Sequence, residues 1–313
     1  MATRERVLVT GGSGFIGACL VRELIAAGCD VHLMLRAESR TWRLTAVEGQ
    51  YTRHDADLRD PEAVRSAVRA SRPDVIYHLA ATGTFHFQCD RAAILTVNVL
   101  GTMNLLKALE RQDYRALVYT GSSSEYGHKD RPIRADDRLE PRGDYALAKG
   151  ASARLCQAAA NRGRPNTVVR IFSAYGPWED SKRIASYVMG CCVCGETPRV
   201  TSGLQPRDFI YVDDVTALLR TAADEPNAYG RILLAGTGQR QTVRDMVETI
   251  GAVCGGRAPL YGAEPPRSDE PAVWQADIEE TTALTGWQPR YDLRTGVEKM
   301  WAWFRATGAR AAA

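Results

Sequence analysis

The 313-residue chain has 45% hydrophobic and 25% charged residues and a formal net charge of +3. These fractions are typical of a soluble globular protein that is long enough to bury a large core. The charge is too small, and the arginines too scattered, to predict a nucleic-acid partner.

The start of the chain runs from Met1 directly into the first predicted strand. We therefore expect no signal peptide, no membrane span and a cytoplasmic location. The eight cysteines then indicate reduced thiols rather than a disulfide framework. Their only cluster, Cys191, Cys192 and Cys194, has poor spacing for zinc and no second Cys/His pair. We predict buried helix residues there and no metal site.

An apolar run from Val7 to Thr10 leads into Gly11, Gly14 and Gly17, and an amphipathic segment follows. A strand, a glycine turn and a helix in this order form the context that a dinucleotide-binding fingerprint requires. The glycines allow a tight turn, close approach of a pyrophosphate, and packing of helix on strand. The helix start, with Phe15 and Ile16, offers free N–H groups to the phosphates.

Beyond this unit, predicted strands alternate with predicted helices, which favours a doubly wound parallel α/β sheet of the Rossmann type. Strands are expected at 31–35, 74–79, 116–120 and 167–172, with a further strand that ends near residue 55. Helices are expected at 61–70, 94–109 and 145–160. After Phe172 the pattern weakens and prolines increase. We expect an NAD(P)-binding domain over 1–172 and a smaller α/β substrate-binding lobe over 173–313, with segments around 205–235 packing back on the first domain.

The second indication of function is a candidate catalytic set of three residues, Ser122, Tyr145 and Lys149. Ser122 follows a predicted strand, and the spacing of four places Tyr145 and Lys149 one turn apart on a helix face. A nearby ammonium and a positively charged nicotinamide would lower the pKa of the phenol. Tyr145 could then exchange a proton with a substrate oxygen that Ser122 holds, while the cofactor exchanges hydride.

Taken together, these motifs resemble the extended short-chain dehydrogenases/reductases, in the NAD(P)-dependent nucleotide-sugar epimerase/dehydratase group. The resemblance covers nearly the whole chain and is carried by the segments 10–17, 55–60, 78–81, 98–102, 170–177, 207–215 and 286–289. It implies that the cofactor site also includes Asp57, Leu58, Leu79, Ala80, Ala81, Asn98 and Phe172. It implies that a nucleotide-sugar substrate contacts Thr82, Ser123, Ser124, Ser173, Arg183, Arg207 and Arg267, with Arg207 and Arg267 on the diphosphate.

Three positions depart from the pattern of this group. Where NAD-preferring relatives carry an aspartate after the second strand, this chain has Leu35 and Arg36, with Arg40 nearby; this favours NADP, with NAD as the alternative. Where 4,6-dehydratases carry an acid, it has Ser124, and Glu125 is one place late, which disfavours dehydration unless the register is off by one. Ser173 replaces the usual asparagine.

The leading hypothesis is thus an NADP-dependent reductase of a nucleotide-activated 4-ketohexose, in which Tyr145 protonates O4. The alternative is an NAD-dependent nucleotide-sugar 4-epimerase with the same three residues. A non-catalytic dinucleotide sensor is a more remote hypothesis. The resemblance also implies a homodimer that pairs the helix at 98–109 with the one starting at Tyr145.

Overall fold

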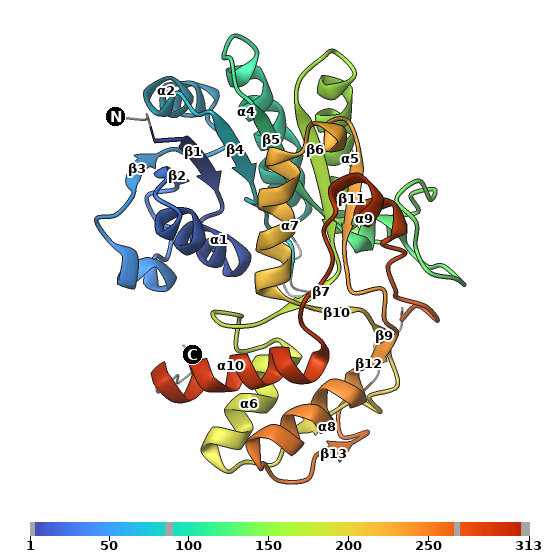
Figure 1. Ribbon diagram of the computed structural model, residues 1–313. Helices are drawn as coiled ribbons and strands as arrows, with labels where there is room; N and C mark the ends of the chain where they lie inside the picture. The colour runs from blue at the N-terminus through green and yellow to red at the C-terminus, as the bar shows by residue number, and fades with distance from the viewer. Residues whose placement is uncertain (1–3, 85–89, 266–269, 308–313) are drawn as a thin grey trace.

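The computed structural model describes residues 4–84, 90–265 and 270–307. Its centre is a seven-stranded, all-parallel sheet in the order β11-β6-β5-β4-β1-β2-β3 (Figure 1). The strands are β1 (Arg6–Thr10), β2 (Asp30–Leu35), β3 (Thr52–Asp55), β4 (Val75–His78), β5 (Ala116–Ser122), β6 (Asn166–Ile171) and β11 (Ile232–Ala235). The predicted doubly wound α/β class is confirmed.

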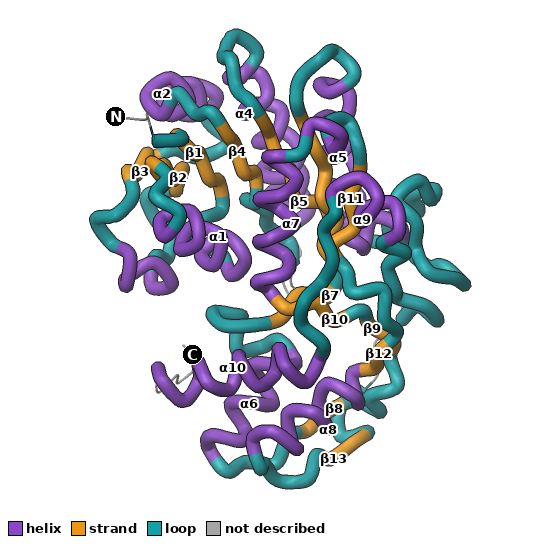
Figure 2. The backbone as a smooth tube through the Cα atoms, in the orientation of Figure 1, coloured by secondary structure: helices purple, strands orange, loops and turns teal. Residues whose placement is uncertain are grey.

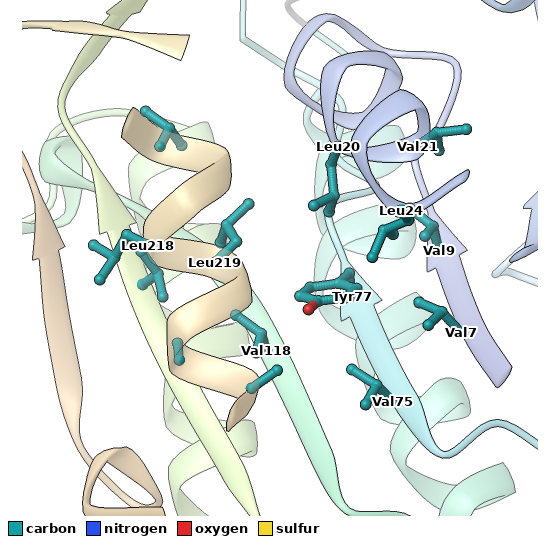
Figure 3. Close-up of a cluster of buried hydrophobic side chains, with 14 of the residues drawn as sticks. Val7, Val9, Leu20, Val21, Leu24, Val75, Tyr77, Val118, Leu218 and Leu219 are labelled. Carbon is teal, nitrogen blue, oxygen red and sulfur yellow. The ribbon is translucent and has the colours of Figure 1, made fainter. Parts of the chain in front are cut away.

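Helices cover both faces of this sheet because its strands are apolar on both sides. On one face, α1 (Phe15–Ala26) and α7 (Val212–Asp224) bury Leu20, Leu24, Leu218 and Leu219 against the strands (Figure 3). The opposite face is covered by α2 (Pro61–Ser71), α4 (Gly101–Leu109) and α5 (Asp144–Ala160). Two elements of the late sequence, α7 and β11, therefore complete the layers that the first 172 residues begin.

A continuous helical stretch over residues 91–109 differs from the single regular helix that the sequence predicts. It consists of α3 (Arg91–Leu95), a π-helical turn η2 (Thr96–Leu100) and α4. By length and composition alone this stretch could cross a membrane, and only a third of its most apolar window is buried. Leu95, Leu100 and Met103 are among its exposed apolar side chains.

Most of the remaining elements form a smaller lobe beside the carboxyl ends of the strands (Figure 2). Its core lies between α6 (Ile184–Cys194), α8 (Val243–Cys254) and α10 (Leu293–Thr307). Short pairs join β7 (Ser173–Tyr175) to β10 (Phe209–Tyr211), β9 (Pro206–Arg207) to β12 (Gln241–Thr242), and β8 (Arg199–Val200) to β13 (Leu260–Tyr261). A last helix, α9 (Glu279–Thr285), packs against β11.

The cysteine cluster lies on α6, as the sequence predicts, but burial varies along it. Cys191 is buried, Cys192 is half-buried and Cys194 is exposed, because α6 turns its last residues toward solvent before Gly195 ends it. The prediction of three buried thiols is therefore wrong for Cys194. No cluster of three or more metal-ligating side chains occurs within the described ranges.

Candidate active site

A pocket of about 610 Å³ opens at the carboxyl ends of the parallel strands, where the smaller lobe faces the sheet. This volume suits a small molecule or cofactor. Its lining includes many of the residues that the sequence singles out: Gly11, Gly14, Phe15, Ile16, Gly17, Leu79, Ala81, Ser122, Ser123, Ser124, Tyr145, Lys149, Phe172, Ser173, Arg183 and Arg207.

The glycine loop forms one wall of the pocket, and two of its glycines leave no room for a side chain. A Cβ on Gly11, which has φ +73°, would lie 2.5 Å from the backbone nitrogen of Ala80, and one on Gly17 would lie 2.2 Å from the Gly11 oxygen. Gly14 is the N-cap of α1 and supplies no capping side chain, and the first turn carries no acid. The free N–H groups and positive helix end thus face the pocket, which fits the diphosphate of a dinucleotide.

Ser122 and Tyr145 meet at the opposite wall. Ser122 ends β5, Tyr145 lies in the first turn of α5, and their side chains share a hydrogen bond. Burial raises the pKa of Tyr145 to about 12, while the charge of Arg183 and the Ser122 hydrogen bond act to lower it. Without a bound cation Tyr145 therefore holds its proton at neutral pH, and the lower pKa that the sequence predicts with a nicotinamide bound stays a prediction.

Lys149 lies one turn further along α5, with only 2% of its surface exposed. Its Nζ is 4.4 Å from the centre of the Tyr119 ring, in a cation–π contact. Burial lowers the pKa of Lys149 to about 8, although the charge of Glu125 opposes this shift. Lys149 is thus a pocket-lining amine that remains mostly protonated at neutral pH.

Glu125 is not a pocket residue but a buried support for Ser122. Its Oε1 accepts a hydrogen bond of 2.7 Å from the backbone nitrogen of Ser122, and its Oε2 pairs with Arg170 Nε at 2.7 Å. Both partners of this ion pair are almost fully buried. Ser124, by contrast, lines the pocket and hydrogen-bonds with the Ser122 hydroxyl at 2.8 Å. A serine therefore occupies the wall where an eliminating enzyme needs a carboxylate.

His78 is buried and holds the turn after β4 in place. The sequence identifies this residue only as part of a motif. Thr102 donates its hydroxyl proton to the Asn98 oxygen, so His78 Nε2 must donate to Thr102 Oγ1, at 2.9 Å. His78 Nδ1 is then left to accept from Thr10 Oγ1, at 2.6 Å. Burial lowers the pKa of His78 to about 3, so this neutral tautomer is held throughout the physiological range.

Asn98, expected in the cofactor site, does not line the pocket but is buried behind the residues that do. Its Oδ1 accepts from the Thr82 nitrogen and its Nδ2 donates to the Thr82 oxygen, both at 2.9 Å. Both ends of the amide are therefore used to hold the loop between β4 and α3. Within that loop Thr84, not Thr82, lines the pocket. A π-helical turn carries Asn98, as is frequent at functional sites.

Arg207, the expected diphosphate ligand, reaches the pocket from the smaller lobe. Its Nη2 donates to Glu270 Oε2 at 2.7 Å, and its guanidinium carbon lies 5.9 Å from the Trp274 ring centre. Any anion that binds Arg207 must therefore compete with Glu270. Neither Glu270 nor Trp274 is predicted from the sequence, since their partner is over 60 positions away. Arg267 lies outside the described residues.

The other expected cofactor residues are not in this pocket but follow the neighbouring strands. Arg36 comes directly after β2 and pairs with Glu38 at 3.2 Å. Asp57 follows β3 and pairs with Arg59, whose hydrogen bonds hold the pKa of Asp57 below its usual range. Leu58 is buried, Arg40 is exposed, and the Ala80 nitrogen donates to Thr10.

A glycine loop at the end of one parallel strand, with Ser122, Tyr145 and Lys149 across the pocket, defines a dinucleotide-dependent enzyme site. The model of the NAD dependent epimerase/dehydratase family matches residues 7–236. The chain belongs to this family, which confirms the resemblance that its motifs predict.

One curated relative and two solved structures are similar to this chain over nearly its whole length. The chain is 30% identical over 313 residues to the UDP-glucose 4-epimerase of Mycolicibacterium smegmatis, covering 96% of this chain and 98% of the relative. The solved UDP-glucose 4-epimerase of Thermus thermophilus, in complex with NAD, has a TM-score of 0.84 and 26% identity, covering 96% and 99% of the two chains. MoeE5 in complex with UDP-glucose and NAD has a TM-score of 0.85 and 29% identity, covering 97% and 99%.

Proposed function

We propose that this protein is a nucleotide-sugar 4-epimerase that acts on a UDP-hexose and uses NAD. One observation carries the proposal: the pocket places the phenol of Tyr145 beside Ser122 and one turn from Lys149, with Ser124 instead of a carboxylate next to it. This set of groups suits reversible oxidation at one carbon. The names of the relatives support the 4-epimerase alternative over the reductase that leads the sequence analysis.

In this proposal each residue has one task. A nicotinamide cofactor, held by the glycine loop and by Lys149, supplies the hydride acceptor and donor. With the cationic nicotinamide bound, Tyr145 would act as the phenolate: its Oη takes the proton of the sugar O4 hydroxyl as O4 becomes a carbonyl, and returns that proton to O4 when C4 is reduced on its other face. Ser122 donates a hydrogen bond to the same oxygen and so stabilises the charge that develops there.

The geometry disfavours dehydration, since that reaction needs a carboxylate to remove the C5 proton. Glu125 has both carboxylate oxygens engaged behind the wall, on Ser122 and Arg170. The carboxylates among the described lining residues are Asp180 and Glu270: Asp180 Oδ1 accepts a hydrogen bond from the Lys182 nitrogen, and Glu270 pairs with Arg207.

The decisive experiment is an assay of the purified protein with UDP-glucose and no added cofactor. We expect UDP-galactose to form, and we expect NAD in the acid extract, because an epimerase restores its cofactor in each cycle. The matching assay supplies NADPH with a nucleotide-linked 4-keto-6-deoxyhexose. Oxidation of NADPH there, with no interconversion of UDP-hexoses, would replace the proposal by the reductase.

The choice between NAD and NADP depends on Arg36, which the Glu38 carboxylate already neutralises. A 2′-phosphate would have to displace that carboxylate, so we expect NADH to bind more tightly than NADPH. Glu38→Gln should strengthen NADPH binding by about two- to fivefold, the usual worth of an exposed ion pair, and leave NADH binding unchanged. Fluorescence titration measures both, and an equal gain for the two nucleotides would contradict this reading.

We also propose a homodimer that pairs two copies of the stretch over residues 91–109 and of α5. The exposed apolar side chains of these two segments are Leu95, Leu100, Met103 and Leu147. Contact with a second subunit would remove them from water. Sedimentation at micromolar concentration tests this proposal, which a monomer would contradict.

A further inference from the structure

Arg43 is a cation in the pocket wall that the sequence analysis does not identify. It lies in the 3-10 helix η1 (Trp42–Val47), after β2, and lines the same pocket as Gly14, Phe15 and Ile16. Its Nε donates to the Trp178 oxygen at 2.7 Å, and its guanidinium carbon lies 4.3 Å from the centre of the Trp42 ring.

The residue that receives this hydrogen bond is itself firmly held. Trp178 has φ +70°, a left-handed conformation that is unfavourable for a bulky side chain. The Arg22 guanidinium lies 4.2 Å from its ring centre, and the Trp303 ring of α10 lies at 4.9 Å, edge to face. Groups from α1, η1 and α10 thus fix the carbonyl that orients Arg43.

The charge of Arg43 lacks a close counter-ion. Among the residues that the structure describes, no ion pair joins Arg43 to a carboxylate, and the acid that acts on its charge is Asp180. The side chain is half-buried, and burial lowers its pKa, while the more distant Asp180 opposes the shift. A cation that is partly removed from water and lacks an ion pair favours an anion in the pocket it faces.

We propose that Arg43 binds the diphosphate bridge of the dinucleotide, opposite the N-terminus of α1. Two contacts place it beside the first turns of this helix: Arg22 donates to the Arg43 oxygen, and Cys19 Sγ contacts the oxygen of Pro177, the neighbour of Trp178. The planar guanidinium complements the helix N–H groups on the second side of the phosphates. The inference rests on the dinucleotide cofactor of the proposed function, and it leaves the substrate diphosphate to Arg207.

The test compares Arg43→Gln and Arg43→Lys with Arg69→Gln, a control at an exposed arginine in the last turn of α2 and outside the pocket lining. Each protein, freed of nucleotide, is titrated with NADH, with ADP-ribose and with adenosine. For Arg43→Gln we expect a 10- to 100-fold loss of affinity for NADH and ADP-ribose, roughly the range for a charged hydrogen bond, and less than about a twofold change for adenosine. Arg43→Lys should recover part of the loss, and Arg69→Gln should lose nothing.

Each other outcome overturns the inference. Equal losses for adenosine and ADP-ribose would mean that Arg43 only shapes the fold, and unchanged affinities would mean that it does not touch the phosphates. Thermal unfolding of each variant without ligand shows whether the fold is intact. The wild-type titration distinguishes this inference from the proposed function. If the wild type binds no dinucleotide, both are refuted. If the wild type binds dinucleotide and the Arg43 variants bind it equally well, only the inference is refuted.

Discussion

Replacement of Tyr145 by phenylalanine is expected to lower turnover by a factor of about 10² to 10⁴ while cofactor binding stays intact. This is the usual contribution of a positioned acid–base group, and the Tyr145 hydroxyl contacts Ser122 at the pocket wall. The ring still fills its place in Tyr145→Phe, so the loss reports the hydroxyl. Steady-state kinetics with UDP-glucose and titration with NADH measure the two effects separately.

Tyr229→Phe is the matched control for this substitution. The Tyr229 hydroxyl donates to the Ala223 oxygen at 3.2 Å, outside the pocket lining, so its loss should leave turnover within about twofold. If Tyr145→Phe turned over substrate as fast as the parent, proton transfer through this phenol would be excluded and the proposed mechanism with it.

Glu125→Gln is expected to destabilise the fold by about 3 to 5 kcal/mol, because it leaves the Arg170 charge buried without a counter-ion. The site has no room to adapt: a Cβ on Gly121 would already lie 2.7 Å from Glu125 Oε1 and 2.9 Å from the Arg170 side chain. Urea unfolding measures the free energy change. Activity should fall as well, since the single side-chain oxygen of glutamine cannot accept from both the Ser122 nitrogen and Arg170 as the two oxygens of Glu125 do.

The control for Glu125→Gln makes the same chemical change at the surface. Glu38→Gln breaks the Arg36–Glu38 pair, whose side chains are 50% and 63% exposed, and exposed pairs contribute about 0.2 to 1 kcal/mol. Equal destabilisation by the two variants would show that the buried pair contributes no more than an exposed one.

The sequence predicts the sheet, the glycine loop and the Ser–Tyr–Lys set because each depends on local patterns. Apolar runs mark the strands, three glycines mark the turn, and a spacing of four places Tyr145 and Lys149 on one helix face. The short strand β11 is predicted only as part of a segment that packs back, since four apolar residues are a weak signal.

The features that the sequence misses depend on partners distant in the chain. The supporting role of Glu125 requires Arg170, 45 positions away, and the orientation of Arg43 requires Trp178, 135 positions away. The burial of Tyr145 is missed for a similar reason: the spacing reveals a nearby ammonium but not the depth of the pocket, which raises the pKa of the phenol in the chain alone.

The crowding at Gly17 has a practical meaning for anyone who wishes to redesign the coenzyme preference. A Cβ at position 17 would lie 2.2 Å from the Gly11 oxygen, so substitutions at Gly17 would disrupt this turn. The chain just after β2 is different, because Arg36 is half in solvent and can change without disturbing the core. Library designs should therefore keep the turn unchanged and vary residues 36–40, which follow the buried Leu35.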